Sequence, residues 1–124
     1  MKKTISFILC IIVIISCCEM LAFAVVDGSK YTNISTISYS LTISGINSTS
    51  KASLQAKSSM SISIKMELQK LKSGSYSTIK TWTASKTGLA LSMEETRLIN
   101  VLSTYRLKVT FTAGSETVVS YAYP

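Results

Sequence analysis

The sequence contains no histidine and a single proline, and its three cysteines all lie within the first 18 residues. Histidine is the usual general base of enzymes and a frequent metal ligand, so its absence removes the chemistry of the common nucleophilic triads. Beyond residue 18 the chain also lacks a thiolate nucleophile, disulfide bonds and the Cys and His ligands of zinc sites. The composition therefore favours a role other than catalysis.

The start of the chain has the pattern of a bacterial export signal. Lys2-Lys3 gives it a positive end, an apolar run covers residues 5–15, and Ala22-Phe23-Ala24 is the small–x–small motif that signal peptidase reads. We therefore expect a signal-peptide helix within residues 1–24, with cleavage after Ala24.

The same segment has two other interpretations. A membrane anchor needs about 18 apolar residues without charge, and Glu19 ends the run before that length is reached. Ile14-Ile15-Ser16-Cys17 resembles a lipobox, in which the cysteine is lipidated and becomes the new amino terminus. A protein that is lipid-anchored at Cys17 is therefore the alternative to a freely secreted one.

Cleavage would leave one domain, residues 25–124, with 11 basic and 5 acidic residues and a net charge of +6. This domain would contain no cysteine, whereas small secreted animal domains usually carry disulfides. We therefore expect a basic bacterial protein that is secreted or sits at the cell envelope, with no transmembrane segment after processing. The sequence does not indicate an oligomeric state.

Apolar and polar residues alternate over most of this domain, most clearly at 37–43, 60–68 and 105–113. A period of two is typical of half-buried strands. Glycines and polar clusters separate the runs, which predicts seven strands at residues 31–44, 50–57, 60–71, 77–84, 88–93, 104–113 and 116–123. Their number and spacing favour an all-β fold, namely an antiparallel immunoglobulin-like or fibronectin-type β-sandwich, with a small barrel as the alternative.

Three stretches depart from the alternation. The apolar positions slip by one at 68–71, which indicates a bulge or the end of a strand. Ile79 and Trp82 are three residues apart, so they cannot share one face of a regular strand. Residues 94–102 have a weak helical pattern, but a short turn crossing between two sheets is the better interpretation.

Three short motifs, Leu68-Gln69-Lys70, 78–82 and 104–110, follow one another along the chain. Together they resemble a family of small secreted proteins of Gram-positive bacteria, most of them uncharacterised. The resemblance spans most of residues 30–123 and implies an immunoglobulin-like sandwich. It also implies that Tyr105 is a corner tyrosine, whose hydroxyl contacts nearby backbone. This chain lacks the strand cysteines of disulfide-bearing sandwiches, so no covalent core is implied.

The acidic residues do not indicate a catalytic or metal site. Glycosidases need two carboxylates about 5 to 9.5 Å apart, and the adjacent Glu94 and Glu95 would point to opposite faces of a strand. Glu67 and Glu116 are interpreted as solvated surface charges. Calcium sites need about six to eight oxygen ligands, and the sequence has no glycine-rich phosphate loop. We therefore predict no enzymatic activity, no cofactor and no bound metal.

The first candidate for a binding site is a basic surface. If the third, sixth and seventh strands are neighbours in one sheet, Lys65, Arg106 and Lys108 project from its outer face, with Lys70 and Lys72 near one end. Such a patch suits anionic polymers such as wall teichoic acids, acidic glycans, lipid headgroups or nucleic acid. The competing interpretation is that these charges only keep the face soluble and discourage pairing between sheet edges.

The second candidate is Trp82, the only tryptophan. Exposed aromatic rings would stack on sugars, whereas a tryptophan between two sheets would fill the core. The other aromatic candidates are Tyr31 and Tyr76 in or near turns and Tyr121 and Tyr123 on the last strand. Binding of nucleic acid by stacking requires aromatic and basic side chains on one face. Because Arg106 and Lys108 alternate with Tyr105 and Leu107, we predict no nucleic-acid partner.

The sequence thus predicts a non-enzymatic secreted β-sandwich with a binding or structural role at the bacterial envelope. Its partner would be an anionic wall polymer, a glycan or another envelope protein. The alternative is a carbohydrate-binding or adhesion module that uses exposed aromatics around Trp82. A membrane-active toxin is the third class considered, but strands with one polar face do not resemble inserting ones. The predicted binding residues are Lys65, Lys70, Lys72, Trp82, Arg106 and Lys108.

Overall fold

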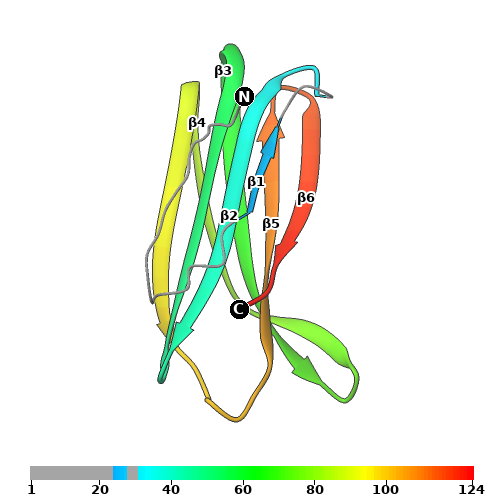
Figure 1. Ribbon diagram of the computed structural model, residues 1–124. Helices are drawn as coiled ribbons and strands as arrows, with labels where there is room; N and C mark the ends of the chain where they lie inside the picture. Colours follow the sequence, from blue (N-terminus) through cyan, green and yellow to red (C-terminus); the bar gives the residue numbers. More distant parts are fainter. Residues whose placement is uncertain (1–23, 28–30) are drawn as a thin grey trace.

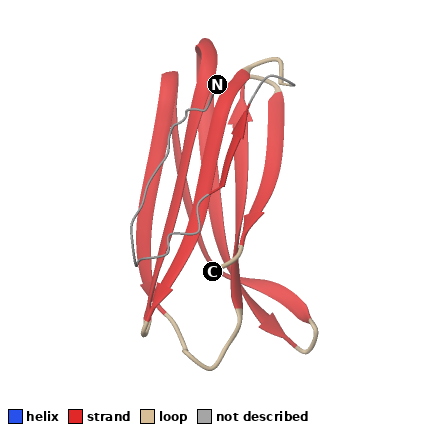
Figure 2. Ribbon diagram, in the orientation of Figure 1, coloured by secondary structure: helices blue, strands red, loops and turns tan. Residues whose placement is uncertain are grey.

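The computed structural model describes residues 24–27 and 31–124, and this part of the chain is built from strands (Figure 2). The strands are β1 (Ala24–Asp27), β2 (Ile34–Ser44), β3 (Asn47–Lys72), β4 (Ser75–Leu98), β5 (Tyr105–Ala113) and β6 (Glu116–Ala122). All strand pairs are antiparallel, which confirms the predicted all-β class. The predicted signal-peptide helix and the lipobox Cys17 lie outside the described residues.

The prediction of seven separate strands is wrong, because two pairs of predicted strands are continuous. The predicted strands 50–57 and 60–71 are both part of β3. Likewise, 77–84 and 88–93 are both part of β4. β3 and β4 pair on both sides of the irregularity between Gln55 and Met60, so the strands bend there without ending.

The bend divides β3 into two parts with different neighbours. Residues 47–56 pair with β2, whereas residues 62–70 pair with β5 on the same edge of the strand. Between Gln55 and Met60, four residues of β3 lie opposite a single residue of β4. In Figure 1, β3 and β4 both fold over at the upper end, so the antiparallel sheet is curled and β2 comes close to β5 and β6.

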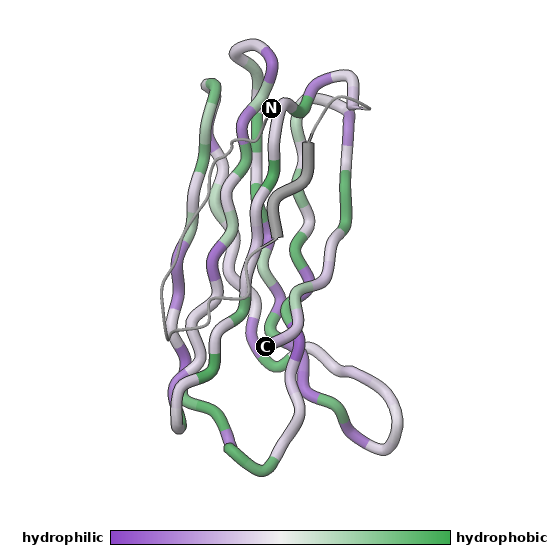
Figure 3. Tube along the Cα trace, in the orientation of Figure 1, coloured by the Kyte–Doolittle hydropathy of each residue, from purple (hydrophilic) through white to green (hydrophobic). Residues whose placement is uncertain are grey.

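The core lies inside the curl, and Figure 3 shows apolar and polar positions alternating along the strands around it. The predicted inward row of β5 is confirmed, since its residues at 105, 107, 109, 111 and 113 are at most 2% exposed. The matching row of β3 consists of Ile62, Ile64, Met66 and Leu68. Across the core, the rings of Tyr39 on β2 and Phe111 on β5 are 6.2 Å apart between centroids. One apolar cluster therefore joins both halves of the curled sheet.

Tight turns join β2 to β3, β3 to β4 and β5 to β6. Each turn contains a glycine with positive φ, namely Gly45 (61°), Gly74 (84°) and Gly114 (61°). A side chain at such a position is strained, which explains why glycine ends these runs in the sequence. Gly88, by contrast, has no positive φ and lies within β4 next to the bend.

The three-residue spacing between Ile79 and Trp82 is explained by a bulge in β4. Ile79 is an extra residue between two successive pairs that β4 makes with β3. The insertion returns both side chains to the same side of the strand, where both pack against the core. The slip in the pattern at 68–71 therefore marks a bulge in the partner strand, not the end of β3.

The turn between β4 and β5 is hydrogen-bonded to Tyr105, the first residue of β5. The hydroxyl of Tyr105 accepts a hydrogen bond from the N–H of Asn100 at 3.0 Å. The side chain of Asn100 in turn accepts one from the N–H of Leu102 at 2.9 Å. The expected backbone contact of a corner tyrosine is thus confirmed. The predicted turn starts only after Leu98, because residues 94–98 still pair with β3.

The side chain of Glu116, at the start of β6, forms hydrogen bonds with the backbone of residues 32–34, around the start of β2. One carboxylate oxygen accepts hydrogen bonds from the N–H groups of Asn33 (2.8 Å) and Ile34 (3.1 Å), and the other from that of Thr32 (3.0 Å). Glu116 is therefore a surface charge, as predicted, but its carboxylate is also hydrogen-bonded to three backbone N–H groups. Loss of solvent acts to raise the pKa of Glu116, but these donors and the charge of Lys57 outweigh it and hold the pKa below its ordinary value.

Replacement Glu116→Gln should destabilise the protein most at neutral pH. A carboxyl group whose pKa is lowered by folding adds stability above its unfolded pKa, and this is lost as the pH falls through the folded value. The difference in urea midpoint between variant and wild type should therefore be large near pH 7 and shrink below about pH 4. Glu94→Gln is the control, since Glu94 accepts no hydrogen bond from the described residues. A difference that does not vary with pH would contradict this role.

Candidate functional site

Three of the predicted binding residues share the outer face of β3 and β5. Lys65 lies on β3, and Arg106 and Lys108 lie on β5, each between two buried residues of its strand. In the register of the two strands, Lys108 is opposite Glu67 and Arg106 is opposite Gln69. The two strands therefore bring these three cations to one polar face.

Arg106 on β5 is held in place by side chains from three other strands, β3, β4 and β6. Its guanidinium carbon lies 4.0 Å from the ring centroid of Tyr76 on β4 and 4.3 Å from that of Tyr121 on β6. Its Nε donates a hydrogen bond to Oε1 of Gln69 on β3 at 2.7 Å. Each such contact between a cation and an aromatic ring contributes about 0.5–2 kcal/mol. The guanidinium is therefore a fixed part of this face.

These tyrosines correct one premise of the sequence analysis. The alternation within β5 predicted that aromatic and basic side chains would lie on opposite faces, and Tyr105 does point inward. Tyr76 on β4, the strand beyond β3, and Tyr121 on the adjacent β6 nevertheless place two aromatic rings beside Arg106. Aromatic and basic side chains thus meet on one face after all. The premise is wrong because it considered a single strand.

Glu67 partly neutralises the same face. Its Oε2 lies 3.9 Å from Nζ of Lys65, whose side chain is 51% exposed. Its Oε1 accepts a hydrogen bond from the hydroxyl of Thr78 at 3.2 Å. An exposed ion pair of this kind contributes at most about 1 kcal/mol, so it would yield readily to a polyanion. Lys108 has no ion-pair partner among the described residues.

Lys70 and Lys72 do not join this row of cations. Lys70 pairs with Tyr105, whose side chain points into the core, and is itself half-buried. Lys72 is exposed and pairs with Ser75 beside the β3–β4 turn, beyond the end of β5. The predicted basic set therefore divides into three residues that share a face and two that do not.

Trp82 is neither a core residue nor part of an exposed aromatic platform. It is half-buried and packs against the core from β4. The tyrosines expected near it are elsewhere, since Tyr76 and Tyr121 flank Arg106. Instead, Trp82 lines a groove between the two ends of the folded-over β4, together with Lys80, Thr96, Arg97 and Leu98. The sequence did not indicate this groove, because its two sides are more than a dozen positions apart.

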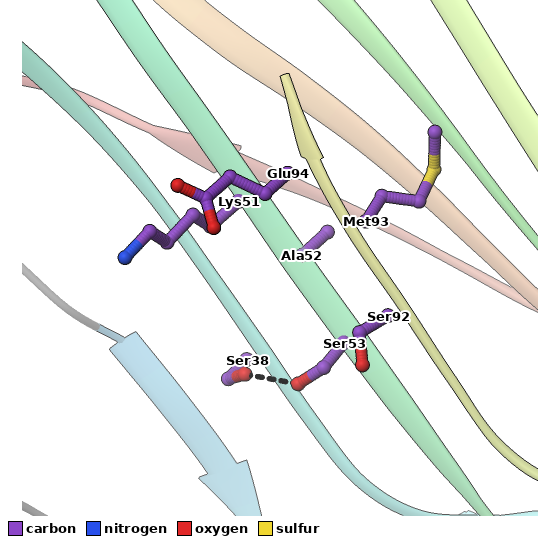
Figure 4. A pocket seen from close by; sticks show the side chains of 7 residues that line it. All are labelled: Ser38, Lys51, Ala52, Ser53, Ser92, Met93 and Glu94. Carbon is purple, nitrogen blue, oxygen red and sulfur yellow. Dashed lines mark hydrogen bonds between the residues drawn. The ribbon is translucent and has the colours of Figure 1, made fainter. Parts of the chain in front are cut away.

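A second, shallow hollow lies on the half of the sheet that contains β2 (Figure 4). It is lined by Ser38, Lys51, Ala52, Ser53, Ser92, Met93 and Glu94. The hydroxyls of Ser38 and Ser53 are hydrogen-bonded to each other at 2.5 Å. Lys51 lies opposite Glu94 in the strand register, so one cation and one carboxylate offset each other here. This hollow offers neither a net charge nor an activated nucleophile.

In the part of the chain that the structure describes, no group of three or more His, Cys, Asp or Glu side chains could hold a metal ion. Within residues 24–27 and 31–124, no helix has the length and hydropathy of a membrane span.

No family model matches this chain, and no curated protein does. Two solved structures match this chain. The solution structure of CsgH from R. palustris is 16% identical, with a TM-score of 0.49, over 71% of this chain and 90% of that one. The E. coli curli protein CsgC is 17% identical, with a TM-score of 0.43, over 68% of this chain and 94% of that one. Similarity at this level does not indicate what the chain does.

Proposed function

We propose that this chain is a non-enzymatic protein of the bacterial envelope or exterior that binds an anionic polymer through the outer face of β3 and β5. The observation that carries the proposal is the row formed by Lys65, Lys108 and Arg106 on that face. A charge of +6 on residues 25–124 adds long-range attraction for a polyanion. The envelope is the proposed location because residues 1–24 have the pattern from which an export signal was predicted.

The spacing of the row suits a chain of repeated negative charges better than a single small anion. Arg106 and Lys108 are two residues apart on one strand, which corresponds to about 7 Å. Lys65 is diagonal to Lys108, since it pairs with Thr110, and this adds a further step of about 7–8 Å. A polymer with phosphate groups along its backbone, such as a wall teichoic acid, could contact all three cations at once.

We also propose that the curled sheet is a fibronectin-type sandwich in which β3 and β4 cross from one layer to the other. One layer would consist of β1, β2, the first half of β3 and the second half of β4. The other would consist of the first half of β4, the second half of β3, β5 and β6. The corner position of Tyr105 at the start of β5 supports this assignment.

Binding to poly(glycerol phosphate), measured at low and at high salt, tests the proposed site. The double replacement Lys65→Gln/Lys108→Gln should weaken binding by about tenfold at low salt and reduce its salt dependence. Lys51→Gln/Lys86→Gln removes the same charge from other parts of the surface and serves as the control. If both double variants lost the same affinity for poly(glycerol phosphate), only net charge would matter. The outer face of β3 and β5 would then not be the binding site. Absence of binding by the wild type would reject the function.

A further inference from the structure

A groove that combines charged and apolar residues lies along β4, apart from the basic outer face of β3 and β5. Among the described residues β4 pairs only with β3, so its other edge has no partner strand in that part of the chain. Because β4 folds over (Figure 1), its two halves form the two sides of the groove that contains Trp82. Lys80 and Trp82 come from the first half, and Thr96, Arg97 and Leu98 from the second.

The groove combines positive charge with an apolar surface. Lys80 and Arg97 face it from opposite sides, and neither forms an ion pair with a described residue. No acidic side chain within residues 24–27 and 31–124 lines the groove, although Glu94 and Glu95 are close in sequence; Glu94 lines the separate hollow beside Lys51. Two cations without a carboxylate partner make the groove attractive for an anion.

The apolar part of the groove is fixed in position. Trp82 packs against the core with part of its indole and lines the groove with the rest, so it presents a rigid apolar surface. On the other side, Leu98 is 67% exposed at the end of β4. The backbone there is held because the carbonyl of Arg97 accepts a hydrogen bond from the hydroxyl of Ser48 at 2.9 Å.

We propose that this groove binds an acidic sugar unit of a glycan, a pyranose ring that carries a carboxylate. The apolar C–H face of the ring would stack on Trp82, while the carboxylate pairs with Arg97 and Lys80 and a ring hydroxyl bonds with Thr96. A neutral sugar would leave both cations without a partner. A simple anion would make no use of Trp82 and Leu98. The site is independent of the proposed outer face, which needs charge alone.

The fluorescence of Trp82 reports directly on the groove, because it is the only tryptophan in the chain. Polygalacturonate at low salt should change its emission and bind the protein. Dextran, a neutral glycan, and polyglutamate, a carboxylate polymer without sugar rings, should not change the emission. An equal response to polyglutamate would overturn the sugar assignment in favour of an acidic polypeptide. An equal response to dextran, or no response to polygalacturonate, would overturn the site.

Variants separate this groove from the outer face. Arg97→Gln/Lys80→Gln leaves Trp82 in place as the probe and should raise the polygalacturonate concentration needed for the Trp82 response by about tenfold. Lys86→Gln, on the same strand but outside the groove, is the matched control and should change binding by less than about twofold. Lys65→Gln/Lys108→Gln should leave the Trp82 response unchanged, so failure of one site can be distinguished from failure of the other. If Lys86→Gln and Lys65→Gln/Lys108→Gln weakened the Trp82 response as much as Arg97→Gln/Lys80→Gln does, the proposal would be contradicted.

Discussion

Val109→Asp should prevent the protein from folding. Val109 is 0% exposed in the middle of β5, between rows of apolar side chains. An aspartate there would be a buried charge without a partner, which costs several kcal/mol or more. Because a domain of this size is stable by only about 5–15 kcal/mol, the folded state should no longer be populated. Loss of the β-sheet signal in far-UV circular dichroism would show this.

Thr110→Asp, one residue further on, is the control. Thr110 lies on the outer face, opposite Lys65 and only partly buried. The new carboxylate would stay in contact with water, so the variant should fold and lose no more than about 1 kcal/mol. If both variants unfolded, or both folded, the assignment of inward and outward positions on β5 would be wrong.

Phe111→Ala should lower the free energy of unfolding by about 3–5 kcal/mol, because it leaves a cavity at the centre of the core. Phe111 is fully buried and contacts the ring of Tyr39, which lies on the other half of the curled sheet. Urea unfolding followed through the emission of Trp82 measures this change. Thr112→Ala, on the outer face beside it, should change stability by less than about 0.5 kcal/mol.

A double-mutant cycle tests whether the two halves meet as described. Phe111→Leu and Tyr39→Leu each remove one ring of the pair, and the double variant removes both. The coupling energy should be about 0.5–1.5 kcal/mol, as expected for two aromatic side chains in contact. Additive effects of the two replacements would mean that β2 and β5 do not face each other across the core.

Much of the fold follows from local patterns in the sequence. The alternation at 105–113 fixes which residues of β5 face the core, because side chains on a strand alternate whatever its neighbours are. The polar residues 57–59 also break the alternation, which predicts the end of a strand at a place where β3 in fact continues. Whether a strand ends or bends there depends on the pairing between β3 and β4, and this involves residues distant in sequence.

For the candidate sites too, the sequence predicts which residues share a face of one strand, but not which strands meet. Alternation alone placed Arg106 and Lys108 on one face. The rings that contact the Arg106 guanidinium belong to Tyr76 and Tyr121 on two other strands. Only the tertiary structure brings these residues together. Similarly, no local pattern shows that Arg97 approaches Trp82, because the folding-over of β4 creates that groove.

Glu116 illustrates the same limit for a single side chain. In the sequence it is an isolated acid at the start of the last predicted strand, a setting typical of surface charges. Its carboxylate binds N–H groups of residues 32–34, more than 80 positions earlier in the chain. The low density of acids in this basic sequence gave no indication of that contact, since it depends on the closure of the curled sheet.

The most direct test of binding through the outer face is to map amide chemical shifts by NMR while poly(glycerol phosphate) is added at low salt. We predict that the perturbed amides gather around Lys65, Glu67, Arg106 and Lys108, and that the perturbations disappear at high salt. The residues around Lys51 in the hollow of Figure 4 should not respond. Perturbations spread evenly over the surface, or confined to the half of the sheet that contains β2, would contradict the proposed function.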